Sequence, residues 1–322
     1  MSLATTAGAS GLIFVVDEPL EPHVDRLSEG TVWELGDVEP SMPAVLVGKE
    51  ALKSAFERLG VDALPASQSG PRSVEAGGLL AADLQVETFT APNVIAIAPG
   101  SDPALRDEYV LITAHMDHLG VGSPVDGDSI YNGADDNASG TAAVLEVAEA
   151  VAALERAPRR SIMFATLSGE ERGLLGSAWF VEHPPVPLDR IVANINIDMI
   201  GRNWEDTIAV IGKPYSSLGT LVDSVAAAHP DLGMAVAGDL WPSEGFFFRS
   251  DHFNFARKGI PAVFFFNGVH EDYHQPSDEV DKIKFAKSAR VARLVYEVTL
   301  ALANAEERPR WDPRVRDRVI GR

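Results

Sequence analysis

From about residue 79 onward, short and nearly continuous apolar runs alternate with segments whose apolar residues recur every three to four positions. Continuous apolar runs are typical of strands buried on both faces of a sheet, and the longer period is typical of helices that cover it. The runs predict strands at PNVIAIA (92–98), YVLITA (109–114), RSIMFATL (160–167), VANINID (192–198), TIAVIG (207–212) and PAVFFF (261–266). Helices are expected over 138–154, 217–228 and 284–305. This alternation predicts a three-layer α/β domain with a mixed, mostly parallel central sheet.

The two ends of the chain have a different pattern. Short strands at 12–16 and 44–47 and a helix at 50–59 precede the stretch PASQSGPRS, which is typical of a linker. The final segment, EERPRWDPRVRDRVIGR, carries six arginines and two prolines and is expected to be exposed. We therefore predict a small N-terminal module over 1–75, a larger domain over 76–305 and an exposed tail over 306–322.

Composition restricts the classes of partner. The chain has 322 residues, 46% of them hydrophobic, and its 27 basic against 47 acidic residues give a net charge of −20. Such a charge repels phosphate backbones, so nucleic acid is not an expected partner, whereas cations and amines are attracted. No apolar run reaches the roughly 18 residues of a membrane span. The absence of cysteine excludes disulfides, thiolate metal sites and a cysteine nucleophile. The oligomeric state is left open.

Acidic and imidazole side chains follow the predicted strands, at the sheet edge where ligands of open α/β folds bind. They are His115, Asp117, Asp135, Asp136, Glu170, Glu171, Asp198, His270 and His274. Each alone has a structural explanation, such as a helix cap or a favourable charge in a first helical turn. Together they would repel one another and resist desolvation unless a cation neutralised them. Carboxylate and imidazole without thiolate favour zinc, with manganese or cobalt as substitutes.

The adjacent acids suggest a division of labour. One aspartate of a pair can bridge two ions about 3.5 to 4 Å apart while its neighbour orients the turn. One glutamate of a pair can bind metal while the other stays free to accept a proton from water. The doublets therefore indicate a centre with two metal ions and a general base.

Five segments carry a resemblance to a known family: AHMDHLG, NGADDNASG, SGEERGLLGS, NIDMIG and DYHQPSDEVDKI. In this order they resemble the metal-site segments of the co-catalytic zinc aminopeptidases, a family that also includes glutamate carboxypeptidase, the transferrin receptor ectodomain and glutaminyl cyclase. The resemblance covers roughly residues 90 to 300. The segment MPAVLVGKEALKSAFERLG is similar to the end of a protease-associated domain. The chain starts inside that module, so further sequence upstream is expected.

The resemblance implies a role for each matching residue. It implies two zinc ions, with His115 and Asp198 on one, Glu171 and His274 on the other, and Asp135 bridging both. Glu170 matches the general base, and Asp117 matches the aspartate that hydrogen-bonds the free ring nitrogen of the ligand histidine. The relatives are mostly exported, so a secreted or periplasmic location is expected.

The implied activity is hydrolysis of peptide bonds, with an aminopeptidase that takes peptides with a free, apolar N-terminal residue as the leading hypothesis. A carboxypeptidase or dipeptidase would need a cation for the substrate carboxylate, and Arg202, Arg249 and Lys213 are candidates. A glutaminyl cyclase with a single zinc and a non-catalytic, receptor-like binding module are two further hypotheses.

Several residues near the site have weaker signals. Phe247 and Phe248 lie in an irregular aromatic stretch and are candidates for an apolar wall, and Tyr273 for stabilising an oxyanion. Ser250 and Asp251 are interpreted as caps of a helix. Phe264 to Phe266 are expected in the core, and His118 and His270 are interpreted as bystanders.

Overall fold

The computed structural model describes residues 12–16, 44–49, 53, 57–58 and 87–321. The chain divides into two compact units, Met1–Phe89 and Thr90–Arg322. In the first unit, strands β1 (Leu12–Val16) and β2 (Ala44–Gly48) pair in parallel. Both short strands were expected from the sequence. Of the helix expected over 50–59, only residues 53 and 57–58 are described, and most of the predicted module 1–75 lies outside the described residues.

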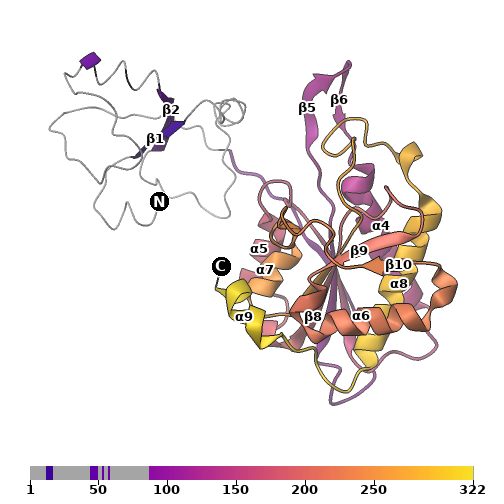
Figure 1. Cartoon of the computed structure of the whole chain (residues 1–322). Coiled ribbons are helices and arrows are strands. Elements are labelled where there is room, and N and C mark those ends of the chain that lie inside the picture. The colour runs from indigo at the N-terminus through magenta and orange to yellow at the C-terminus, as the bar shows by residue number, and fades with distance from the viewer. Residues whose placement is uncertain (1–11, 17–43, 50–52, 54–56, 59–86, 322) are drawn as a thin grey trace. The chain divides into compact units, whose positions relative to one another are not determined.

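A sheet forms the centre of the second unit (Figure 1). It has seven strands in the order β10-β9-β11-β8-β4-β7-β3. Its strands are β3 (Val94–Ala98), β4 (Tyr109–His115), β7 (Ser161–Leu167), β8 (Ile191–Ile197), β9 (Thr207–Ile211), β10 (Ala235–Ala237) and β11 (Ala262–Phe266). Pairing is antiparallel between β3 and β7 and between β9 and β11, and parallel elsewhere. The mixed, mostly parallel sheet and its six predicted strands are confirmed. The three residues of β10 are too few to produce a recognisable pattern.

Helices cover both faces of this sheet. Helices α4 (Gly140–Ala152), α6 (Ser217–Ala228) and α8 (Phe285–Asn304) share one core with Val110 and Ile112 of β4. Helices α5 (Leu175–Glu182) and α7 (His252–Arg257) share a second core with Leu111. This alternation follows from the two-residue period of a strand and confirms the three layers. Within the described part of the chain, no helix has the length and apolar character that crossing a bilayer requires.

The hairpin formed by β5 (Gly120–Val125) and β6 (Asp128–Tyr131) projects from the body of the second unit (Figure 1). All residues of β5 are exposed, and Val121 is 80% exposed. Without a buried face, the hairpin has no hydrophobic alternation from which the sequence could predict it.

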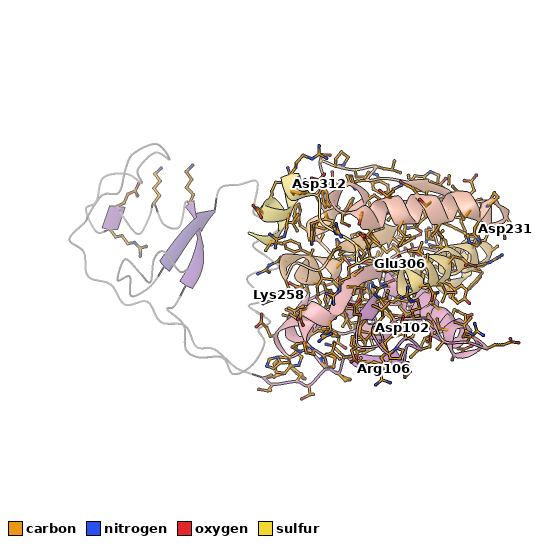
Figure 2. All side chains as sticks on the ribbon, turned by 90° about the horizontal axis from the view of Figure 1, so that it is seen from below. Asp102, Arg106, Asp231, Lys258, Glu306 and Asp312 are labelled. Atoms are coloured by element: carbon orange, nitrogen blue, oxygen red, sulfur yellow. The ribbon has the colours of Figure 1, made fainter. Side chains whose placement is uncertain are left out.

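Most described residues of the segment 306–322, predicted to be an exposed tail, are exposed, but the segment packs on the domain at a few positions. Trp311 donates its indole N–H to the carbonyl of Gly259 at 2.8 Å. Asp312, labelled in Figure 2, accepts a backbone N–H at the start of helix α9 (Pro313–Ile320), and Val319 of this helix is buried. Only a few apolar residues of the segment carry its packing, while most of its charged residues stay in water.

Parallel pairing brings the carboxyl ends of β4, β7, β8 and β11 to the same edge of the sheet. The turn that precedes α4 lies directly against this edge. A Cβ atom on Gly140 would lie 2.5 Å from the carbonyl oxygen of Ile197, at the end of β8. Only glycine permits this close approach, and it brings the aspartate doublet of the turn to the strand ends.

Lys287 of α8 provides a test of this packing. Its side chain is fully buried and donates to Asn267 Oδ1 at 3.0 Å and to the carbonyl of Arg202. Burial lowers the pKa of Lys287 to about 8. The folded state therefore binds this proton less tightly than the unfolded chain, and the free energy of unfolding should rise as the pH rises above about 8.

We expect the stability of the wild type relative to Lys287→Met to increase by on the order of 1 to 2 kcal/mol between pH 7 and 9.5. Urea unfolding at both pH values measures this difference, and Lys258→Met, at an exposed position, is the control for loss of a lysine. A difference that is flat or falls with pH would contradict the buried ammonium.

Candidate active site

A cavity of about 320 Å³ opens at the carboxyl ends of the strands. One side of its lining is polar and is formed by Asp136, Glu170, Glu171, Asp198 and His274. The other side is apolar and includes Met199, Phe246, Phe248, Phe264, Phe266 and Val269. A few convergent polar groups beside an apolar wall are typical of a small-molecule or catalytic site.

The first polar group surrounds His115, the last residue of β4. Its Nε2 atom lies 3.2 Å from Asp198 Oδ1 and 3.3 Å from Asp136 Oδ1. One potential ligand atom each from His115, Glu170 and Asp198 lie within 4.8 Å of one another. Three strand ends therefore converge on a position suited to one cation.

The second polar group surrounds Glu171. His118 Nδ1 lies 2.8 Å from Glu171 Oε1, and His274 Nε2 lies 3.1 Å from Glu171 Oε2. His274 Nε2 is also 3.2 Å from Asp136 Oδ2. Because Oδ1 of Asp136 faces His115 and Oδ2 faces His274, this carboxylate lies between the two groups.

The aspartate between the two polar groups is Asp136 and not Asp135, which was expected to bridge the two metal ions. Asp135 Oδ1 accepts the backbone N–H of Gly201 at 2.6 Å, and Oδ2 accepts from Asn267 Nδ2 at 3.2 Å. Asp135 thus points away from the position between His115 and His274, which Asp136 occupies. Which of the two aspartates faces the centre depends on the backbone dihedral angles of the turn, where Asp136 has φ −107° and ψ 83°. The amino-acid sequence alone does not specify these angles.

Asp117 also acts differently from the expectation. The ring Nδ1 of His115 lies 3.0 Å from the backbone carbonyl of Asp117 and 3.8 Å from its carboxylate. A carbonyl only accepts, so Nδ1 carries the proton in neutral His115 and Nε2 presents its lone pair to the centre. The carboxylate of Asp117 instead accepts the backbone N–H groups of Glu170 at 3.1 Å and Glu171 at 3.3 Å.

A buried polar ladder reaches the site through β8. Asn194 donates to Thr113, which donates to Asn196, which donates to Ser250 at 2.9 Å. Ser250 in turn donates its hydroxyl proton to Asp198 Oδ2 at 2.8 Å. The ladder explains two asparagines inside an otherwise apolar strand and fixes the rotamer of Asp198.

The capping interpretation of Ser250 and Asp251 is wrong. The Ser250 hydroxyl contacts Asp198, and the Asp251 side chain makes no cap hydrogen bond with α7. The Asp251 carboxylate is fully buried, and its burial raises its pKa to about 7. His252 beside it is buried as well and stacks on Phe264, and burial lowers the pKa of His252 to about 3.

The two histidines interpreted as bystanders both contact acidic residues. His118 lies against Glu171, and His270 Nε2 is 3.2 Å from Asp135 Oδ2. The only sequence signal for His118 was its position three residues after His115. His118 therefore lies in the loop beyond the strand, and the direction of its side chain depends on the conformation of that loop.

Electrostatics in the cavity reflect an excess of carboxylates. Burial raises the pKa of Glu170 well above its ordinary value, and the charges of Asp198 and Asp251 raise it further, while His115 partly offsets the effect. Burial alone would lower the pKa of His274, but its hydrogen bonds to Asp136 and Glu171 reverse this and raise it to about 9. The carboxylates thus favour the positively charged form of the imidazole of His274.

The residues present fit a divalent metal. His118 Nε2 is buried and has no hydrogen-bond partner within the described part of the chain, and the buried atoms Glu171 Oε1 and Asp136 Oδ2 face imidazole nitrogens at 2.8 and 3.2 Å. A buried polar atom without a partner is rare in folded proteins unless it has a ligand. Imidazole nitrogen and carboxylate oxygen in this combination suit zinc.

The aromatic wall differs in part from the prediction. The 3₁₀-helix Phe246–Phe248 has three residues per turn, so successive side chains face different directions. Phe247 is 1% exposed and packs on Tyr215 and His252 rather than lining the cavity. Phe246 and Phe248 line it instead. Phe264 and Phe266 are buried as expected, but they also form part of the cavity wall.

Tyr273 lies in the cavity beside His274. The two rings stack with centroids 3.8 Å apart. His274 has φ +57°, a left-handed conformation that is uncommon for residues other than glycine and that clusters at functional sites. Burial and the nearby carboxylates raise the pKa of Tyr273, so its hydroxyl keeps its proton and can donate it in a hydrogen bond.

Comparisons with known proteins find chains of similar sequence and fold. Aminopeptidase YwaD from Bacillus subtilis (strain 168) is 29% identical over 241 residues, which cover 71% of this chain and 49% of YwaD. The crystal structure of BSAP, a zinc aminopeptidase from Bacillus subtilis, is similar with a TM-score of 0.52 and 27% identity over 64% of this chain and 48% of that chain. A glutaminyl cyclase from Porphyromonas gingivalis shares the fold, with a TM-score of 0.52 and 23% identity over 64% of this chain and 76% of that chain.

The fold and the site define an α/β domain with a candidate metal centre at the carboxyl ends of its strands. Residues 93–299 match Peptidase family M28, and the chain belongs to this family. It spans about half the length of the curated relatives that it matches.

The two aspartates of the turn can be separated by mutation. We expect Asp136→Asn to weaken zinc binding by more than about 100-fold and Asp135→Asn by only about 10-fold, because loss of a ligand exceeds the effect of a group behind the ligands. Competition with a chromogenic chelator measures both dissociation constants. An equal or larger loss for Asp135→Asn would restore Asp135 as the bridging residue.

Proposed function

We propose that the chain is a zinc-dependent aminopeptidase that removes apolar N-terminal residues from peptides. The observation that carries the proposal is the Asp136 carboxylate between two imidazole–carboxylate groups, with Glu170 and an apolar wall in the same cavity. Membership of Peptidase family M28 and the similarity to the aminopeptidases named above support it.

Two zinc ions would use this donor set. His115 and Asp198 would hold one ion and Glu171 and His274 the other, with Asp136 shared between them. When bound, zinc polarises a carbonyl group and lowers the pKa of a water molecule from about 15.7 to about 7.

Glu170 is the proton carrier in this proposal. It lies in the cavity without serving as the shared carboxylate, and burial raises its pKa well above its ordinary value, which makes its carboxylate a stronger base. Glu170 accepts a proton from the attacking water and passes it to the leaving amine of the peptide. Tyr273, which keeps its hydroxyl proton, donates a hydrogen bond to the carbonyl oxygen as negative charge develops there.

Substrate selection follows from the two sides of the cavity. Phe246, Phe248, Phe266 and Met199 favour an apolar side chain because its transfer from water is favourable. The acidic residues opposite favour a protonated amine, and the net charge of −20 attracts cationic peptides.

The alternative of a carboxypeptidase or dipeptidase rests on one observation. Arg202 is engaged with Asp272 at 2.6 Å, and Lys213 pairs with Asp223. Arg249, in contrast, lines the cavity, with its guanidinium 4.8 Å from the centre of the Phe246 ring. Arg249 is therefore the one candidate of the three that could recognise a substrate carboxylate.

Replacement of Glu170 tests the hydrolytic role. We expect Glu170→Gln to lower kcat on leucine p-nitroanilide at least about 100-fold, because a positioned base contributes about 10²- to 10⁴-fold, while zinc content stays unchanged. Elemental analysis and kinetics of the same preparation measure both quantities. Glu244→Gln, at an exposed position, is the control, and removal and re-addition of zinc should abolish and restore activity.

Retention of activity in Glu170→Gln would favour a non-catalytic, receptor-like role, and a zinc count of one per chain would favour the cyclase.

Arg249 separates the two peptidase classes. For an aminopeptidase, Leu-Gly and Leu-Gly-amide should be cleaved at rates within about threefold of each other, and Arg249→Gln should leave their ratio unchanged, because no charge-assisted hydrogen bond to the carboxylate is involved. Arg257→Gln is the control, since Arg257 also lies over an aromatic ring, that of Phe253. A preference of at least about 10-fold for the free acid that disappears in Arg249→Gln, as loss of a charged hydrogen bond predicts, would instead establish a dipeptidase.

A further inference from the structure

The loop Asn267–Asp278, which follows β11, contacts the aspartate turn at several points. It supplies His274 to the candidate metal centre, and Asn267 and His270 contact the carboxylate of Asp135. The last residue of the loop, Asp278, is fully buried. It touches neither polar group directly: its Oδ2 atom and its carbonyl contact the backbone of the turn, and its Oδ1 atom lies 3.8 Å from Arg202 Nη1.

Asp278 binds three successive amides of this turn. Its Oδ2 atom accepts the N–H groups of Asp135 at 2.9 Å and Asp136 at 3.1 Å. Its backbone carbonyl accepts the N–H of Ala134 at 3.1 Å. One residue thus accepts the amides of three successive positions, so the start of the turn is fixed relative to Asp278.

The contacts of Asp135 hold the same turn from its side chain. Gly201 donates to Oδ1, and Asn267 donates to Oδ2. The residue immediately before Asp136 is thus fixed through both its amide and its carboxylate. With these atoms fixed, the direction of the next side chain follows from the backbone.

The other acidic doublet is held in the same way. The carboxylate of Asp117 accepts the backbone N–H groups of both Glu170 and Glu171. In each case a carboxylate outside the doublet binds the two amides of the doublet. This repetition favours positioning of the doublets over a contribution to stability alone.

We propose that Asp278 is a positioning residue of the metal centre: by accepting the amides of Asp135 and Asp136, it directs the Asp136 carboxylate between His115 and His274. The inference rests on the proposed metal centre. It assigns the effect to the location of the acceptor oxygen, not to the negative charge of Asp278.

Two conservative variants separate acceptor from charge. Asp278→Asn keeps an acceptor oxygen at the same distance from the backbone and removes the charge, whereas Asp278→Glu keeps the charge and displaces the acceptor by one methylene. We expect the zinc dissociation constant to stay within about threefold of wild type in Asp278→Asn and to rise about 10- to 100-fold in Asp278→Glu, the range for groups that orient ligands. Asp281→Asn and Asp281→Glu, at an exposed position of the same region, should leave zinc affinity unchanged.

The measurements are zinc competition with a chromogenic chelator, the thermal unfolding midpoint of the zinc-free proteins, and hydrogen exchange of segment 131–140. Exchange at residues 134–136 should be slow in both the wild type and Asp278→Asn. Rapid exchange there in the wild type would overturn the inference even if Asp278→Glu did not fold.

Three other results would also overturn it: the reverse order of zinc affinities, equal losses of zinc affinity in both variants, or a lower unfolding midpoint with unchanged zinc affinity. A wild type that binds no zinc would remove the proposed function as well, whereas the other outcomes leave that proposal intact.

Discussion

The repulsion between buried carboxylates at one edge of the sheet is the constraint on which the rest of this structure depends. Asp136, Glu170, Glu171 and Asp198 share a cavity of about 320 Å³, where like charges interact more strongly than in water. The fold keeps them together with imidazoles on either side and with hydrogen bonds from neutral groups. This arrangement costs stability unless a cation is bound, which is why it indicates function and not structural support.

A layer of groups behind the cavity fixes the direction of each acidic side chain. The ladder through β8 ends at Ser250, which orients Asp198. Asp117 and Asp278 hold the glutamate and aspartate doublets through their amides. From the sequence, Asp117 and Ser250 were expected to make other contacts, and Asp278 was not singled out. Every residue except proline has a backbone N–H group, so the sequence does not reveal which amide such a carboxylate binds.

The fold contributes rigidity and proximity to this layer. The strands that carry His115 and Asp198 are central and fully buried apart from the first residue of β4, so their ends are fixed relative to each other. The remaining groups come from loops, and His274 in one of them has a left-handed conformation that is uncommon for residues other than glycine. The strands thus fix His115 and Asp198, and the loops bring the other groups to them.

The sequence by itself determined the strands of the sheet, its layers and the edge at which acids and imidazoles gather, because apolar runs are buried by the hydrophobic effect and parallel strands end at a common edge. It did not determine which aspartate of the doublet faces the centre, that His118 joins it, or that the C-terminal segment packs on the domain. These features depend on dihedral angles within turns and on contacts between distant segments, such as that between Asp135 and Asp278, 143 positions apart. Only the tertiary structure brings such partners together, so only it could decide them.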